Sequence, residues 1–226
     1  MQDQPAPQAC EIDWNGDLPV SRRFGDSYYA RGGGPGEVRH VFLGGNDLPA
    51  RFRPGFAIAE TGFGTGLNML VARAAWAAAE VPGRLRYTSF EAFPMAAGDI
   101  ARALGAFPAV GATAEGFLAA YAAGARRWED EAIVLEIVPG DARRTVPRWQ
   151  GRADAWFLDG FAPARNPAMW EPALLEAVAA HTAPGGTAAT YTAAGAVRRA
   201  LAAAGFEVTR VPGFGAKRHM TRARKP

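Results

Sequence analysis

The sequence predicts an α/β fold, in which a mostly parallel sheet of seven strands, one of them antiparallel, carries helices on both faces. From residue 56 onward, short apolar segments alternate with longer alanine-rich segments, as expected for strands joined by crossover helices. A glycine-rich turn joins the first of these strands to the first helix. The last two apolar segments lie too close together for a crossover helix, so a hairpin is predicted there.

The expected elements follow in order along the chain. Strands are predicted at 56–60, 85–90, 132–138, 153–158, 187–192, 206–211 and about 219–222. Helices are predicted at 67–80, 95–104, most of 106–131, 167–181 and 194–204, with a short helix or turn at 141–147. Proline and glycine set several boundaries, such as Pro82 and Gly83 after the first helix and Gly205 after the last.

The part of the chain before the regular pattern is rich in turn signals. We expect a flexible tail at 1–12, a small N-terminal cap of short strands and loops at 13–53, and the main domain at 54–226. The glycines at 32–34 and 36 favour a loop, and residues 38–43 are predicted to form a short strand. The cap is expected to lie at the open end of the main sheet.

Composition limits the classes of function. The chain has 226 residues, is 49% hydrophobic and carries a formal charge of +3, a mild excess that only hints at a polyanionic partner. A single cysteine, Cys10, excludes an internal disulfide and argues against a cysteine-built zinc site, and no metal is expected. No apolar run approaches the roughly 20 residues that span a bilayer, and the polar N-terminus is unlike a signal peptide. We therefore expect a cytoplasmic protein without a membrane partner.

Three glycines mark the turn after the first strand. Gly62, Gly64 and Gly66 stand at alternate positions, where the backbone can take positive φ or approach a ligand closely. The dinucleotide fingerprint is G-x-G-x-x-G, so here the third glycine comes one residue early. The turn predicts a nucleotide-type site at a helix N-terminus, with a turn that holds no ligand as the alternative.

Acidic residues recur where predicted strands end. Glu60, Glu91, Asp141 and Asp159 all fall near the carboxyl ends of strands, the edge at which open α/β sheets bind ligands. Glu91 can accept two hydrogen bonds from a ribose diol, or can simply face water. Asp141 fits an adenine contact or a helix N-cap equally well. Asp159 follows a strongly apolar strand, where a carboxylate costs desolvation, and it can bind and deprotonate an amine or cap the next helix.

Longer motifs carry a resemblance to a known family. They are ETGFGTGLN at 60–68, WFLDGFAPARNPAMW at 156–170, GFGAKRHM at 213–220 and the segment 19–46. Together they resemble the methyltransferase domain of the bacterial enzyme that makes 5-methylaminomethyl-2-thiouridine at the tRNA wobble position (the MnmC N-terminal domain, or its stand-alone form MnmD). The resemblance implies the class I S-adenosylmethionine-dependent methyltransferase fold.

The resemblance also implies a reaction, a cofactor and a partner. The reaction is methyl transfer from S-adenosylmethionine to the 5-aminomethyl group of uridine 34 in the anticodon loop of tRNA, with Asp159 holding and deprotonating the amine. The implied cofactor-binding residues are Glu60, Gly62, Gly64, Gly66, Asn68, Glu91, Asp141 and Ala142. The implied substrate-binding residues are Tyr28, Tyr29, Phe161, Pro163, Lys217 and Arg218. Phosphate contacts are expected from the basic C-terminal tail, which also holds Arg222, Arg224 and Lys225, and from Arg22 and Arg23 in the cap.

The chain departs from the bifunctional members of that family, which carry a second, flavin-dependent oxidoreductase domain. It is not expected to perform the oxidative step, and such an oxidoreductase, acting on the same nucleoside, is a possible functional partner. One alternative is a methyltransferase of this fold that acts on a small-molecule or protein amine. Another is a non-catalytic nucleotide-binding module or an NAD-dependent oxidoreductase. The short glycine spacing argues against the oxidoreductase.

Overall fold

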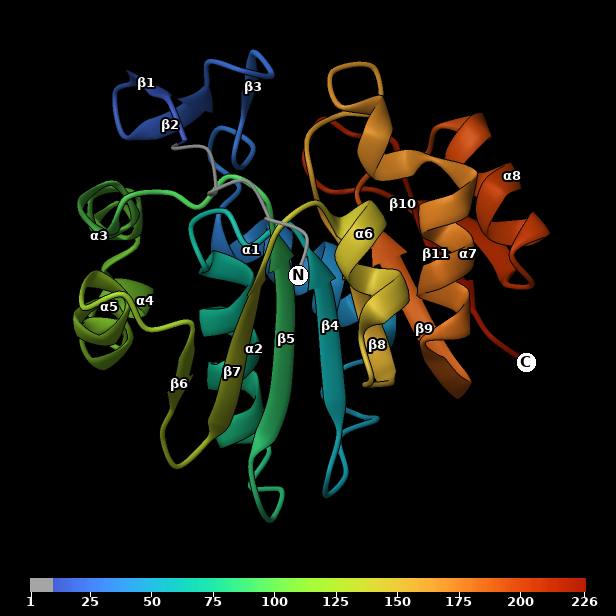
Figure 1. Cartoon of the computed structure of the whole chain (residues 1–226), viewed down its shortest axis with the longest axis horizontal. Coiled ribbons are helices and arrows are strands. Elements are labelled where there is room, and N and C mark those ends of the chain that lie inside the picture. Colours follow the sequence, from blue (N-terminus) through green and yellow to red (C-terminus); the bar gives the residue numbers. More distant parts are fainter. Residues whose placement is uncertain (1–9) are drawn as a thin grey trace, which may run out of the picture.

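A central sheet of eight strands organises the molecule, for which a computed structural model describes residues 10–226 (Figure 1). The strand order is β10-β11-β9-β8-β4-β5-β7-β6. The strands are β4 (Ala57–Thr61), β5 (Leu85–Glu91), β6 (Arg127–Glu129), β7 (Ile133–Pro139), β8 (Ala153–Leu158), β9 (Thr182–Thr190), β10 (Glu207–Pro212) and β11 (His219–Arg224).

Strand direction confirms the mostly parallel sheet and corrects its size. Strands β9, β8, β4, β5 and β7 pair in parallel, while β11 runs antiparallel to both β9 and β10, as the predicted hairpin requires. The predicted sheet of seven strands lacks one strand of the structure, β6. This strand pairs antiparallel with β7 and is a second antiparallel strand beside β11. This short strand is held by Trp128, whose ring packs edge-on against Phe117 at 5.9 Å between centroids.

Helices cover both faces of the sheet, as predicted (Figure 1). They are α1 (Pro35–Val38), η1 (Arg39–Leu43), η2 (Gly44–Asn46), α2 (Leu67–Ala78), α3 (Ala97–Gly105), α4 (Pro108–Gly111), α5 (Glu115–Ala122), α6 (Ala142–Thr145), η3 (Val146–Arg148), η4 (Pro167–Trp170), α7 (Pro172–Ala180) and α8 (Gly195–Ala203). Two hydrophobic clusters result, because neighbouring residues of a strand point to opposite faces: Ile58 of β4 joins one cluster and Ala59 the other.

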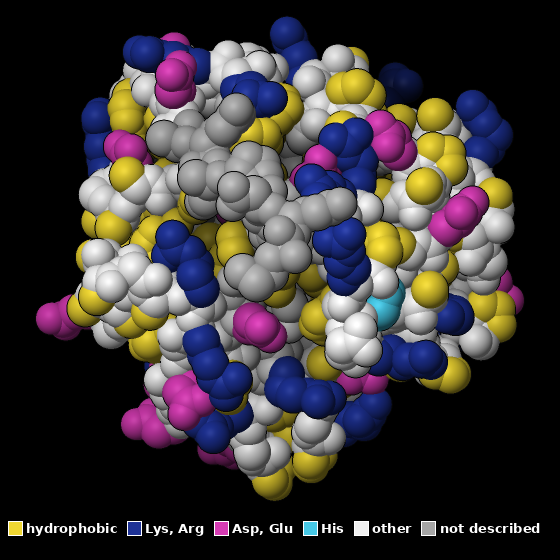
Figure 2. All heavy atoms as spheres, in the orientation of Figure 1, with side chains coloured by type: hydrophobic (Ala, Val, Ile, Leu, Met, Phe, Trp, Pro, Cys, Tyr) yellow, Lys and Arg dark blue, Asp and Glu magenta, His cyan; other side chains and the backbone are white. Residues whose placement is uncertain are grey.

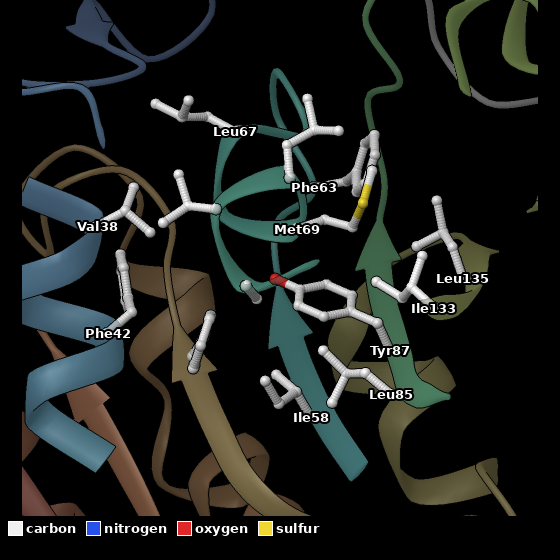
Figure 3. Packing of buried hydrophobic residues seen from close by; sticks show 14 of the residues in the cluster. Val38, Phe42, Ile58, Phe63, Leu67, Met69, Leu85, Tyr87, Ile133 and Leu135 are labelled. Atoms are coloured by element: carbon white, nitrogen blue, oxygen red, sulfur yellow. The ribbon is translucent and has the colours of Figure 1, made fainter. Parts of the chain in front are cut away.

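The predicted strand at 38–43 is wrong, because this segment is helical in α1 and η1. Its β-branched and aromatic composition favoured a strand. The buried residues Val38, Val41 and Phe42, however, stand three and four positions apart, which places them on one helical face. Pro35 at the first position starts the helix. Figure 3 shows Val38 and Phe42 on this helix, directed toward the sheet.

Two predicted long helices are also broken in the structure. Within 106–131, α4 and α5 are separate, and Gly124 at φ 87° precedes β6 instead of continuing a helix. Within 167–181, the 3-10 helix η4 ends before α7, since the residue before a proline is pushed out of the helical region. Glu171, which precedes Pro172, accordingly has ψ 142°.

A small antiparallel sheet from the cap lies at the carboxyl ends of the parallel strands (Figure 1). Its strands are β1 (Ile12–Asn15), β2 (Leu18–Ser21) and β3 (Asp26–Ser27), in the order β1-β2-β3. Asp26 ties this sheet to the loop after β8, because its Oδ2 accepts a hydrogen bond from the Ala162 amide at 2.9 Å. Most of the predicted tail, residues 1–9, lies outside the described residues. Among residues 10–226, no helix has the length and apolarity needed to cross a membrane.

The rest of the cap is joined to the middle of the main sheet. Asn46, which is completely buried, donates to the carbonyl oxygens of Phe42 at 2.9 Å and Trp156 at 3.2 Å, and accepts from the Thr187 hydroxyl at 2.6 Å. Arg51 donates to the Asp154 carbonyl at 3.1 Å. These bonds fix residues 35–53 onto strands β8 and β9.

Candidate active site

A cavity of about 1160 Å³ opens between the cap and the carboxyl ends of the parallel strands. It brings together residues that lie far apart in the sequence. The sequence-predicted residues that line it are Tyr28, Tyr29, Gly62, Gly64, Asn68, Glu91, Asp141, Ala142, Asp159, Phe161 and Lys217. Four others, Glu60, Gly66, Pro163 and Arg218, are not among its lining residues.

The glycine turn after β4 forms one wall. Gly62 has φ 88° and donates its amide to the Phe90 carbonyl at 2.9 Å, so the turn is held against β5. Gly64 has φ 54°, and a Cβ there would lie 3.2 Å from the ring of Tyr28. Gly66, at φ 73°, is the N-cap of α2. The turn therefore needs glycine both for its backbone conformation and for the close approach of the cap.

Two acidic residues, Glu91 and Asp141, line the cavity, and Glu91 is bonded to the turn. Glu91 accepts hydrogen bonds from the amides of Gly64 at 3.0 Å and Phe93 at 2.7 Å, which leaves further lone pairs on its carboxylate. Asp141 caps α6 by accepting from the Arg143 amide at 2.9 Å, and it also pairs with the Arg143 guanidinium at 2.6 Å. The N-cap role is thus present, and Asp141 lines the cavity as well.

Asp159 stands at the end of β8, whose residues are all buried. Its Oδ1 accepts from the Gly160 amide and its Oδ2 from the Asn68 side chain, both at 2.7 Å. Burial raises the pKa of Asp159 to about 6, and these two hydrogen bonds act in the opposite direction. The carboxylate is therefore fixed in orientation and titrates near neutral pH.

Glu60, predicted to bind the cofactor, is fully buried behind the cavity wall. Its carboxyl group accepts from Asn68 and from the Ser89 hydroxyl, each at 2.7 Å. The pKa of Glu60 is raised, first by burial and second by the nearby charge of Asp159. Glu60 is therefore buried and is not among the residues that line the cavity.

Aromatic rings also line the cavity, and one of them, Tyr28, lies against the turn. Phe161 stacks on Phe24 of the cap with 4.8 Å between ring centroids, and Tyr28 meets Phe161 edge-on at 5.1 Å. The loop that carries Phe161 is held from behind, since the Trp170 indole donates to its carbonyl at 3.0 Å. Such a wall offers flat apolar surface to a planar ring.

An ion pair that the sequence did not reveal closes another side of the cavity. Lys217 contacts Glu37 at 3.0 Å and lies 4.0 Å from the ring centroid of Tyr191. The Tyr191 hydroxyl donates to the Gly160 carbonyl at 2.7 Å, next to Asp159. The start signal at Pro35 could have placed Glu37 on a helix. Tyr191 directly follows β9, and its place at the carboxyl end of a strand could have identified it as a residue of the ligand-binding edge.

The C-terminal basic residues have different surroundings. Arg222 pairs with Asp47, Arg222 and Arg224 line a second, smaller hollow, and Lys225 donates to the Ala179 carbonyl at 2.6 Å. The cavity itself is lined by Arg22, Arg23, Arg143, Arg165 and Lys217. Figure 2 shows Lys and Arg side chains across the centre and lower part of the face, with Asp and Glu between them. In the described part of the chain, no group of three or more His, Cys, Asp or Glu is placed to hold a metal ion.

Comparison with known families decides the class of protein. Residues 110–226, more than half of the chain, match the model of a family described as S-adenosyl-L-methionine-dependent methyltransferase. The chain belongs to this methyltransferase family. Its membership agrees with the predicted fold class and gives the enzyme its cofactor, S-adenosylmethionine.

Curated relatives of this methyltransferase have informative names. It is 46% identical to the "tRNA 5-methylaminomethyl-2-thiouridine biosynthesis bifunctional protein MnmC" of Stutzerimonas stutzeri, over 98% of this chain and 36% of that protein. It is 45% identical to the protein of the same name from Chromobacterium violaceum, over 93% of this chain and 34% of that protein. The chain thus spans about a third of the length of these relatives.

Solved structures support the fold of this methyltransferase. MnmC2 from Aquifex aeolicus superposes with a TM-score of 0.75 at 24% identity, covering 99% of this chain and 73% of that one. TrmN from Thermus thermophilus superposes with a TM-score of 0.54 at 17% identity, covering 94% of this chain and 50% of that one. These likenesses concern the arrangement of strands and helices.

The cavity residues fit the cofactor. The turn at Gly62 and Gly64 presents backbone without side chains, and a Cβ at Gly64 would crowd the ring of Tyr28. Glu91 is acceptor-only when ionised, which suits a ribose diol. Asp141 and Ala142 line the cavity after the neighbouring strand β7. Asp159 follows β8 and Glu91 ends β5, the two strands on either side of β4, and both line the cavity.

Proposed function

We propose that this chain methylates a primary aliphatic amine on a tRNA base, the 5-aminomethyl group of the wobble uridine at position 34. The observation that carries the proposal is the fixed carboxylate of Asp159, which shares one cavity with the glycine turn and an aromatic wall. The names of the relatives support the choice of substrate, because they place those proteins in 5-methylaminomethyl-2-thiouridine biosynthesis on tRNA.

The aromatic wall and the carboxylate would bind different parts of the substrate. Phe161, Phe24 and Tyr28 would hold the planar uracil ring by stacking and edge contacts. Asp159 would bind the ammonium group of the aminomethyl substituent and orient its nitrogen toward the methyl donor. A primary alkyl amine is protonated near neutral pH, so it must lose a proton before its lone pair can attack.

S-adenosylmethionine supplies an electrophilic methyl group on a positively charged sulfur. As the amine nitrogen forms its bond to that carbon, the carbon–sulfur bond breaks and the electron pair stays on sulfur. Asp159 accepts the proton that the nitrogen releases, because its pKa near 6 leaves it mostly ionised at pH 7. Asp159 takes one proton from the ammonium before the attack, so the first products are a secondary ammonium, a neutral thioether and protonated Asp159, and the net charge of the reacting groups is unchanged.

The cations around the cavity mouth would receive the tRNA backbone. Arg22 and Arg23 come from the cap and Arg165 from the loop after β8, and they would neutralise phosphates next to a base that enters the cavity. A flavin-dependent oxidoreductase that acts on the same nucleoside remains part of the proposal as a functional partner.

The test is a methyl-transfer assay with labelled S-adenosylmethionine and tRNA bearing 5-aminomethyluridine, with unmodified tRNA alongside. We expect methylaminomethyluridine from the modified tRNA only. Asp159→Asn should bind the cofactor normally but lower turnover at least about 100-fold, as for loss of a general base. Glu131→Gln, at an exposed site between β6 and β7, is the matched control. Cofactor binding without transfer to this tRNA would redirect the proposal to a small-molecule or protein amine.

A further inference from the structure

The side chain of Asn68 joins two carboxyl groups from neighbouring strands. Asn68 lies in the first turn of α2, directly after the glycine turn. Its Nδ2 donates to Oε1 of Glu60 and to Oδ2 of Asp159, both at 2.7 Å. An amide nitrogen carries two hydrogens, so both are used in these bonds. Asn68 therefore has no amide hydrogen left to donate to a ligand.

Glu60 fixes this amide from inside the core. Its side chain is completely buried in β4, and its other oxygen, Oε2, accepts from Ser89 of β5 at 2.7 Å. Burial and the Asp159 charge raise the pKa of Glu60, which favours the neutral acid. A neutral carboxyl group can still accept from Asn68 through one oxygen, and its other oxygen keeps a lone pair that accepts from the Ser89 hydroxyl.

We propose that Asn68 is a positioning residue that locks the Asp159 carboxylate toward the cavity, with Glu60 and Ser89 holding its amide from behind. Asp159 then has one fixed donor on each oxygen, Asn68 on Oδ2 and the Gly160 amide on Oδ1. Asp159 lines the cavity and keeps further lone pairs, with which an ammonium group would pair. The effect on turnover rests on the proposed function, whereas the effect on Asp159 itself does not.

The electrostatic surroundings of Asp159 allow the contribution of Asn68 to be measured. The titratable groups that face Asp159 from the elements around it are Glu37 of α1, Glu60 of β4, Tyr87 of β5, Tyr191 after β9 and Lys217 after β10. Glu37 raises the pKa of Asp159 and Lys217 lowers it, so the effects of these two paired charges on Asp159 partly cancel. The Asn68 hydrogen bond lowers the pKa of Asp159, whereas burial raises it. Removal of this hydrogen bond should therefore raise the pKa of Asp159.

The test titrates Asp159 in the full chain without tRNA. Aspartate carboxyl carbons are labelled with ¹³C, and the Asp159 signal is assigned by its loss in Asp159→Asn. We expect Asn68→Ala to raise the pKa of Asp159 by about one unit. Calorimetry should show affinity for S-adenosylmethionine within about threefold of the wild type. Asn166→Ala, an asparagine variant on the same cavity, should leave the pKa of Asp159 unchanged.

Turnover gives a second reading. Asn68→Ala should lower kcat by about 10- to 100-fold. The acidic limb of the plot of kcat against pH should move by about one unit to higher pH, in step with the pKa of Asp159. Should Asn68→Ala fail to fold, Asn68→Ser serves instead, because a hydroxyl has only one hydrogen to donate and cannot donate to both carboxyl groups. An unchanged Asp159 pKa in a folded variant, with cofactor affinity weakened more than tenfold, would overturn the proposal and make Asn68 a cofactor ligand. Failure of methylation alone, with the NMR shift observed, would count against the proposed function only.

Discussion

Methyl transfer by this chain should lose rate in acid with a midpoint near pH 6. Burial at the end of β8 raises the pKa of Asp159 to about 6 from its ordinary value of 3.8. At pH 5, a carboxyl group with a pKa of about 6 is only about one-eleventh ionised, so kcat should fall about tenfold below its plateau. At its ordinary pKa the same group would still be about 94% ionised at pH 5, and the rate would barely change.

The direction of this effect follows from the form of Asp159 that acts. The carboxylate binds the ammonium and accepts its proton, whereas the protonated acid does neither. Activity is therefore present above the pKa of Asp159 and is lost as the pH falls through it. Above about pH 7 the rate should stay level until the substrate amine itself loses its proton, near pH 10 for an alkyl amine.

The assay is a single-turnover measurement with enzyme in excess over tRNA bearing 5-aminomethyluridine, at saturating S-adenosylmethionine. Binding of tRNA and circular dichroism at each pH separate loss of rate from loss of complex or of fold. The Glu131→Gln variant should reproduce the wild-type profile. A rate that stays constant down to pH 5, while tRNA remains bound, would refute the assignment of Asp159 as the group that must be ionised.

Two further predictions concern the cavity mouth and the cofactor turn. Arg165→Glu should weaken tRNA binding several-fold and flatten the plot of log affinity against log salt by about one unit, while Arg210→Glu on the outer strand β10 should change the slope little; equal slopes for both would exclude the cavity mouth. Gly64→Ala forces φ 54° on a residue with a Cβ and crowds Tyr28, so affinity for S-adenosylmethionine should fall about tenfold by calorimetry. Gly83→Ala, at φ 86° with open space around it, should leave that affinity unchanged, and a similar loss in both variants would point to general strain.

Much of the fold was readable because each strand and turn carried its own local signal. The alternate glycines at 62, 64 and 66 predicted a turn, and all three have positive φ. The segment at 38–43 was misread because its composition favoured a strand, while the spacing of its buried side chains favoured a helix. Composition says which residues are apolar, but only the period says which face they share.

The candidate site was harder to predict, because its contacts join distant parts of the chain. Glu60 and Asp159 end neighbouring strands 99 positions apart, and only the pairing of β4 with β8 brings them to one asparagine. Sequence placed Glu60 at the correct edge but could not show that its side chain points into the core. The partner of Lys217 was likewise hidden, since Glu37 lies 180 residues away.

The attachment of residues 35–53 limits how this enzyme could be rebuilt. Asn46 satisfies backbone groups inside the main sheet, and Val41 and Phe42 belong to its core. A version cut back to the first parallel strand would lack Val41 and Phe42, expose the apolar side chains that they cover, such as Phe157, and leave the Trp156 carbonyl without the Asn46 donor. The same segment carries Glu37 to the cavity. Recognition and folding therefore share residues, and the cap is not a module that could be exchanged to give this scaffold a new substrate.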